Sequence, residues 1–175
     1  MNTSLILTVI SEDKPGVVEH IARVVNNHNG SWLESRLSQL AGKFAGVIRV
    51  QVEQEQQEPL VTALRELRSQ QINIIVDSYE SSNAQNSQAQ KVRFHAAGPD
   101  RTGIIKEFSQ AFANKGINVE ELNTLLSSMP YSGAPLFEAS GILALPENID
   151  LDDLTEKLDD IADELAMDFS LEPLE

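Results

Sequence analysis

The residues best placed to do chemistry form a short turn that occurs twice. Asp13-Lys14-Pro15-Gly16 follows a strand-like segment, and Asp100-Arg101-Thr102-Gly103 recurs 87 positions later. In each copy two β-branched residues come next and open a helical pattern. The free N–H groups of such a helix start carry the positive end of the helix dipole, which suits a carboxylate. The glycine lets a ligand approach the backbone without meeting a Cβ, so each turn is a candidate ligand site.

The aspartates of these turns, Asp13 and Asp100, have two possible roles. Their side chains could cap the following helix or attract the ammonium group of a ligand. Strand-to-helix turns also contain Asp and Gly for folding reasons alone, so the binding hypothesis depends on the recurrence of the turn in two similar frames.

The remaining polar residues do not indicate catalysis. The sequence contains no nucleophile-elbow, phosphate-loop, dinucleotide-binding or zinc-protease motif. His20, His28 and His95 have spacings that match no metal site. We expect the first two at the surface, and His95 in a structural role near Asp100, with contact to a ligand as the alternative. The sequence therefore predicts no enzyme, no cofactor, no metal site and no catalytic residue.

Strand and helix patterns around each turn follow one order. A strand-like segment precedes the turn, an apolar helical face follows it, and two further strands, a second helix and a short last strand come after. This order is the ferredoxin-like split βαβ arrangement. The sequence therefore predicts an α+β fold of two ferredoxin-like βαββαβ domains with antiparallel sheets. We place domain 1 at residues 1–80, a polar linker at 81–90 and domain 2 at 91–175.

The chain is acidic, and the acidity is uneven. Its net charge is −14 over 175 residues. Residues 1–80 carry 7 basic and 10 acidic side chains, whereas residues 91–175 carry 6 basic and 17 acidic ones. Such a surface repels phosphate backbones, so we expect no direct binding to nucleic acid. The overall acidity is interpreted as favouring solubility, with a basic protein partner as the alternative. The acidic pairs of the last predicted helix are interpreted as a solvated face and not as acid/base catalysts.

Features tied to cellular location give a consistent expectation. The sequence has no cysteine, which excludes disulfides and is compatible with the cytoplasm. The N-terminal residues do not resemble a secretory signal, and no apolar run approaches the length needed to span a bilayer. We therefore expect a cytoplasmic protein without membrane contact.

With these residues in view, the sequence resembles the ACT domain family, small regulatory modules that bind amino acids. The resemblance rests on the two Asp-x-x-Gly turns and on Gly116-Ile117-Asn118-Val119, and it covers both halves of the chain. A tandem pair of this length, with Glu34-Ser35-Arg36 and Leu136-Phe137-Glu138, is similar to the glycine cleavage system transcriptional repressor family.

The resemblance implies a set of ligand contacts. ACT domains commonly pair side by side, and ligands lie where the turn of one domain meets its partner. Gly16 and Gly103 match the turn glycine of the family, and Asn118 matches a polar residue that helps to hold the ligand. Trp32 is expected at the first copy's equivalent of Asn118, so that either Ser31 or Ser35 substitutes there or the first copy lacks a full site. The ligand-binding candidates are thus Asp13, Gly16, Asp100, Gly103 and Asn118.

The leading hypothesis is a regulator that senses a small amino acid, glycine or serine, and controls transcription of glycine cleavage genes. The resemblance implies that it acts through a DNA-binding transcription factor and does not contact DNA itself. Two alternatives stay open: a ligand-free structural adaptor, and a detached regulatory subunit of an amino-acid metabolic enzyme. A homodimer is possible, and the sequence does not decide whether domains pair within or between chains.

Overall fold

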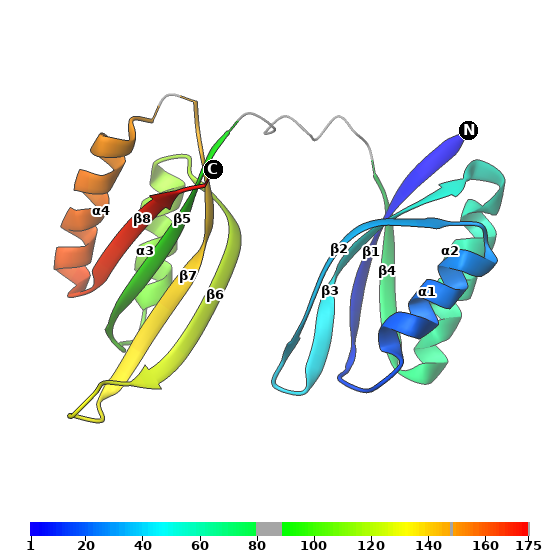
Figure 1. Cartoon of the computed structure of the whole chain (residues 1–175), viewed down its shortest axis with the longest axis horizontal. Helices are drawn as coiled ribbons and strands as arrows, with labels where there is room; N and C mark the ends of the chain where they lie inside the picture. Colours follow the sequence, from blue (N-terminus) through cyan, green and yellow to red (C-terminus); the bar gives the residue numbers. More distant parts are fainter. Residues whose placement is uncertain (80–88, 148, 175) are drawn as a thin grey trace. The chain divides into compact units, whose positions relative to one another are not determined.

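The chain divides into two compact units (Figure 1). A computed structural model describes residues 1–79, 89–147 and 149–174, with the side chain of Lys157 left undescribed. The described parts are called domain 1 (1–79) and domain 2 (89–174), and each has its own hydrophobic core. The linker expected at 81–90 lies almost entirely outside the described residues, and the first strand of domain 2 begins at Gln90.

Domain 1 alternates strands and helices in the predicted order. Its elements are β1 (Asn2–Glu12), α1 (Val17–Asn27), β2 (Ser31–Leu40), β3 (Lys43–Glu53), α2 (Gln57–Glu66) and β4 (Ile72–Ser78). Short 3-10 turns flank α2 at Gln54–Gln56 and Leu67–Gln70. The strands form one sheet in the order β2-β3-β1-β4, with every neighbouring pair antiparallel.

Domain 2 repeats this plan. Its elements are β5 (Gln90–Pro99), α3 (Ile104–Asn114), β6 (Asn118–Ser128), β7 (Pro135–Leu145), α4 (Leu151–Leu165) and β8 (Asp168–Pro173). The sheet order is β6-β7-β5-β8, again antiparallel throughout. The predicted fold, two ferredoxin-like βαββαβ domains with antiparallel sheets, is therefore confirmed.

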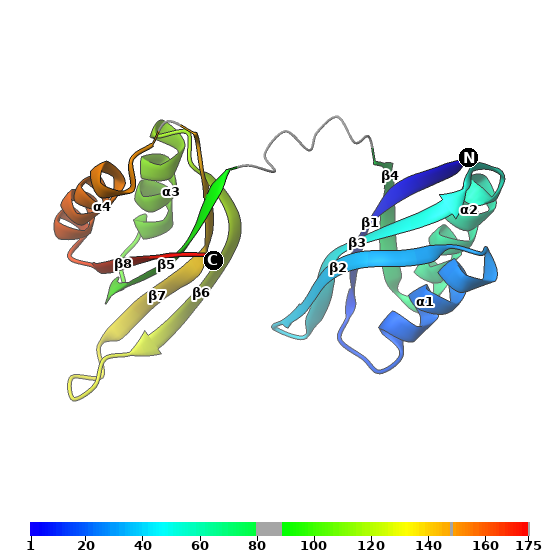
Figure 2. The same ribbon diagram turned by 45° about the horizontal axis from the view of Figure 1, so that its top comes forward.

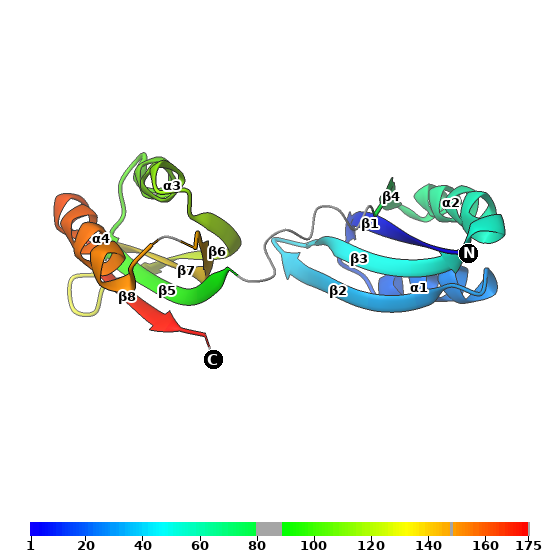
Figure 3. The same cartoon turned by 90° about the horizontal axis from the view of Figure 1, so that it is seen from above.

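Both helices of each domain cover the same face of its sheet, which leaves the other face open (Figure 2 for domain 1, Figure 3 for domain 2). In α1 the buried residues Val17, Ile21 and Val25 recur every four positions and form one apolar stripe against the sheet. The stripe of α3 has the same spacing and is more aromatic. Helix packing therefore fixes where each helix begins, and with it the shape of the turn.

The core of domain 2 is built around phenylalanines. Phe94, Phe108, Phe112 and Phe169 lie with their ring centroids between 4.5 and 6.4 Å apart. The core of domain 1 is aliphatic in its fully buried residues. The two cores share no residue, so each domain buries its own apolar side chains.

The repeat keeps its offset of 87 beyond the first helix. Asn29 and Gly116 occupy the same position after that helix, with φ of +53° and +69°. Asparagine is one of the few residues other than glycine that tolerate this region. Residue type alone would pair Gly30 with Gly116 and requires one residue to be lost, so that pairing does not match the backbone.

Candidate functional site

The two strand-to-helix turns have nearly the same backbone conformation. Gly16 precedes α1 with φ +94° and ψ −5°, and Gly103 precedes α3 with φ +90° and ψ −1°. Side chains other than glycine rarely adopt this left-handed conformation. A Cβ at Gly16 would also meet the His20 ring at 3.3 Å, whereas one at Gly103 would come only within 3.9 Å of a Glu107 carboxylate oxygen. The turn at Gly103 is therefore the more open of the two.

The aspartates anchor the turns through their backbones. The Asp13 N–H donates to the Gly42 carbonyl at 2.9 Å, and the Asp100 N–H donates to the Pro135 carbonyl at 3.1 Å. Each bond ties the turn to the hairpin between the second and third strands of its domain. The capping role considered for the two side chains is not observed, since Gly16 and Gly103 are the N-cap residues and neither helix start has a side-chain cap bond. Both carboxylates lie in exposed residues.

Side chains next to the glycines differ between the domains. In domain 1, Lys14 Nζ donates to the Gln70 carbonyl at 2.8 Å, and His20 Nδ1 lies 2.5 Å from the Gly16 carbonyl oxygen. In domain 2, Arg101 and Glu107 stand at the positions of Lys14 and His20 and bond to each other. The second turn therefore has a cation and an anion beside its glycine, and the first has an imidazole.

The ion pair affects the titration of its members. Hydrogen bonds from Arg101 hold the pKa of the Glu107 carboxyl below its ordinary value, and the same contact raises the pKa of Arg101. Both first helical turns also carry an acid, Glu19 in α1 and Glu107 in α3. These carboxylates already interact favourably with the helix dipole. A ligand at Gly103 therefore meets charges of both signs, which suits a zwitterion better than a simple anion.

Asn118 lies far from the turn of its own domain. It is the first residue of β6 and pairs with Ala144, whose neighbour on β5 is Lys91. The Gly103 turn follows Pro99 at the opposite end of β5. Lys91 and Pro99 are eight positions apart along β5. At a rise of about 3.4 Å per residue, Asn118 and the Gly103 turn are therefore separated by about 27 Å along the strand direction. One domain alone therefore does not bring Asn118 and Gly103 together.

The strand register also identifies the domain 1 equivalent of Asn118. Ser31 pairs with Gln51, whose neighbour on β1 is Ser4, and Ser4 is the equivalent of Lys91 at the offset of 87. Ser31, and not Trp32, therefore occupies the position. Trp32 points toward the core and donates from its indole N–H to Ser35 Oγ at 3.2 Å.

The histidines lie in three different settings. His20 is half-buried above Gly16, and His28 Nδ1 lies 2.8 Å from the Val24 carbonyl oxygen. His95 is exposed on the open face of the second sheet. Within residues 1–79, 89–147 and 149–174, no three His, Asp or Glu side chains gather closely enough to hold a metal ion.

Residues 3–78 match a family model described as ACT domain. Domain 1 is an ACT domain. Domain 2 repeats its topology, its register and the conformation of its turn, so the chain has a tandem ACT fold. No curated protein sequence matches the chain.

Solved structures match the tandem ACT fold along its whole length. A protein of unknown function from Galdieria sulphuraria is 22% identical, with a TM-score of 0.87 and full coverage of both chains. A second structure, provisionally named as a glycine cleavage system transcriptional repressor, is 19% identical, with a TM-score of 0.76 and coverage of 100% of this chain and 99% of its own. At these identities the likeness shows the fold alone.

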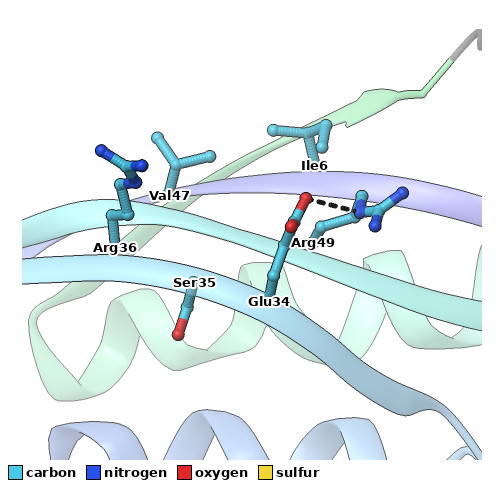
Figure 4. A pocket seen from close by; sticks show the side chains of 6 residues that line it. All are labelled: Ile6, Glu34, Ser35, Arg36, Val47 and Arg49. Carbon is cyan, nitrogen blue, oxygen red and sulfur yellow. Dashed lines mark ion pairs between the residues drawn. The ribbon is translucent and has the colours of Figure 1, made fainter. Parts of the chain in front are cut away.

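The first ACT domain has a further feature that sequence reasoning missed. A shallow depression lies on the open face of its sheet, lined by Ile6, Glu34, Ser35, Arg36, Val47 and Arg49 (Figure 4). Arg49 Nε and a Glu34 carboxylate oxygen are 2.8 Å apart, an ion pair without the alignment of a hydrogen bond. The run Leu5–Ile10 in β1, apolar apart from Thr8, is the signal that could have revealed this face. In the described ranges no helix is both long and apolar enough to cross a membrane.

Proposed function

We propose that this chain is a cytoplasmic amino-acid sensor that controls transcription of glycine cleavage genes through a DNA-binding protein partner. The observation that carries the proposal is the ACT-type turn, formed twice with the same left-handed glycine at a helix start. The similarity in fold to the protein named as a glycine cleavage repressor supports the regulatory role. The net charge of −14 supports action without direct contact to DNA.

The ligand proposed for the second ACT domain is glycine or serine. Its carboxylate would accept from the free N–H groups that follow Gly103 and from Arg101, and its ammonium group would face Glu107 or Asp100. Because Asn118 lies at the far end of the sheet, a site that uses both Gly103 and Asn118 requires residues of a neighbouring domain. A small side chain suits the ligand because Gly103 presents only backbone.

A ligand-free adaptor is the second candidate. The observation that favours it is the Arg101–Glu107 ion pair, in which these two charges beside Gly103 already bind each other. An adaptor predicts the same affinity for the protein partner with and without amino acids. A sensor predicts that the affinity changes.

Calorimetric titration of the whole chain with each common amino acid tests the sensor. We expect glycine or serine to bind, and Gly103→Ala to weaken binding by about tenfold or more, because its Cβ strains the turn. Gly133→Ala is the matched control, since Gly133 has φ +69° in the β6–β7 loop and no neighbour near its Cβ position. Absence of binding by every amino acid at millimolar concentration contradicts the sensor.

An affinity pull-down followed by mass spectrometry tests the partner. We expect a DNA-binding protein to be retained, and its yield to change when the binding amino acid is added. Retention of an amino-acid metabolic enzyme instead would identify a detached regulatory subunit. Binding of glycine cleavage promoter DNA by the chain alone would contradict action through a partner.

A further inference from the structure

The open faces of the two sheets have the same geometry and different chemistry. Strand register places twelve side chains on each face, in three rows that cross all four strands. Those of domain 1 are Ile6, Arg49, Glu34, Asp77; Thr8, Val47, Arg36, Ile75; and Ile10, Ala45, Ser38, Asn73. The equivalent residues of domain 2 are Arg93, Ile142, Glu121, Glu172; His95, Ser140, Asn123, Ser170; and Ala97, Glu138, Leu125, Asp168. These two sets are called face 1 and face 2.

Face 1 carries five aliphatic side chains among its twelve, compared with three on face 2. Ile10, Val47 and Ile75 are 50%, 44% and 65% exposed. Strand β1 reads as a continuous apolar run from Leu5 to Ile10 apart from Thr8, a pattern typical of strands covered on both faces. Strand β5 alternates apolar and polar residues from Lys91 to Ala96, as expected for a strand with one face in water. The two equivalent strands, β1 and β5, thus differ in pattern, and that of β1 indicates that face 1 is covered by a partner.

The net charge of face 1 indicates which kind of partner covers it. Face 1 carries two basic and two acidic residues and is neutral, although the chain as a whole is at −14. Face 2 carries one basic and four acidic residues, a net charge of −3. A strongly charged partner gains nothing at face 1, whereas a second copy of this neutral face meets it without repulsion. Two copies of face 2 would repel each other.

We propose that face 1 is a dimerisation surface, on which the first domains of two chains pack sheet against sheet around a two-fold axis. Ile6, Thr8 and Ile10 of β1 lie along the middle of the contact, and Val47 and Ile75 flank them. Packed sheets lie about 10 Å apart with their side chains interleaved. The same patch on both chains forms the interface.

The area of face 1 is small for a protein–protein interface. Three rows across four strands cover about 400 Å² in projection, compared with the about 800 Å² that each partner contributes to an interface of standard size. The dimer is therefore expected to be weak, reversible and dependent on concentration. It requires no amino acid and is independent of the function proposed above.

Analytical ultracentrifugation of the whole chain from about 1 to about 200 µM tests the dimer. We expect dimers that dissociate on dilution, and an increase in the dissociation constant of about tenfold or more in Ile75→Lys, which buries a charge in the interface. Ser170→Lys is the matched control, because Ser170 occupies the same place on face 2, and it leaves the constant unchanged. Thr8→Lys places the charge at an exposed polar residue and serves if Ile75→Lys does not fold.

The absence of cysteine allows a second readout that locates the contact. A single cysteine at Thr8→Cys should be joined to its copy by a short bis-maleimide reagent, and the equivalent His95→Cys on face 2 should not. A wild-type chain that stays monomeric at the highest concentration overturns the proposal. So does a dimer that persists in both lysine variants, or one that cross-links equally through the two cysteines.

Discussion

Arg101 and Glu107 form a two-point ion pair beside the second strand-to-helix turn. Nη1 lies 3.1 Å from Oε1 and Nη2 lies 2.5 Å from Oε2. Their equivalents in domain 1, Lys14 and His20, bond instead to the backbone of Gln70 and Gly16. The two turns thus keep one backbone conformation and differ in the charges beside it. If the two domains have unequal roles, the side chains beside these two glycines are where their chemistry differs.

The ion pair predicts a pH dependence. The pKa of Glu107 is lowered in the folded chain, chiefly by hydrogen bonds from Arg101. A lowered pKa contributes stability that is present above the unfolded pKa of Glu and is lost as the pH falls through the folded value. Carboxyl-carbon NMR should show that the pKa of Glu107 is higher in Arg101→Met than in the wild type. Lys14→Met, at the equivalent place in domain 1, should leave it unchanged, and equal titrations in wild type and Arg101→Met would refute the pairing.

Gly141→Ala should destabilise domain 2. A Cβ at Gly141 would lie 1.8 Å from the Glu121 carbonyl oxygen and 3.0 Å from the Phe94 ring, so the backbone of β6 must move. We expect a loss of about 1 to 3 kcal/mol in the free energy of unfolding, measured with urea. The neighbouring Ser140 points to the open face, and Ser140→Ala should change the free energy of unfolding by less than about 0.5 kcal/mol. Similar values for the two variants would contradict the close approach of the strands.

Phe112→Ala should unfold domain 2 selectively. Phe112 is 1% exposed and packs against three other phenylalanines, so its removal should cost about 3 to 5 kcal/mol. Because the two cores are separate, the free energy of unfolding of domain 1 should stay at its wild-type value. Leu64→Ala, in the core of domain 1, should give the reverse pattern. Residue-resolved hydrogen exchange distinguishes the domains, and a shift of both together in either variant would show coupled unfolding.

Asp150→Ala should weaken the start of α4. The Asp150 carboxylate accepts a hydrogen bond from the Asp152 N–H at 3.0 Å. Loss of such a cap lowers the free energy of unfolding by about 1 kcal/mol. Asp150→Asn keeps an acceptor and should retain most of the stability in chemical denaturation. An asparagine variant as unstable as the alanine variant would show that the charge, and not the cap, stabilises the helix.

The order of elements could be predicted from the sequence because periodicity and turn residues agree. Val17, Ile21 and Val25 recur at helical spacing, and their burial confirms the stripe. An aspartate directly before an apolar helical pattern predicts a helix start at Asp150, and its carboxylate caps α4. An aromatic content of 5% predicts that aliphatic side chains build most of the core, and they form most of both cores. Composition does not show that four of the six phenylalanines gather in domain 2.

The candidate site was less accessible from the sequence. The turns at Gly16 and Gly103 were found because glycine at a helix start has a physical reason. The distance from Gly103 to Asn118 depends on strand direction and register, which the spacing of residues along the chain does not contain. Residue type pairs Gly116 with Gly30, whereas the left-handed backbone conformation pairs it with Asn29. The assignment of Asp13, Gly16, Asp100, Gly103 and Asn118 to ligand binding stays a prediction.

The bonds from Asp13 to Gly42 and from Asp100 to Pro135 have a mechanical consequence. Each bond adds a second link, to a hairpin, beside the backbone that joins the turn to its strand and helix. In domain 1 the acceptor lies in the tight connection Ala41-Gly42, and in domain 2 the acceptor Pro135 is the first residue of β7, next to the longer loop 129–134. A short connection has fewer free torsions and yields less to the same force. The turn of domain 1 should therefore be held more rigidly by its hairpin than the turn of domain 2.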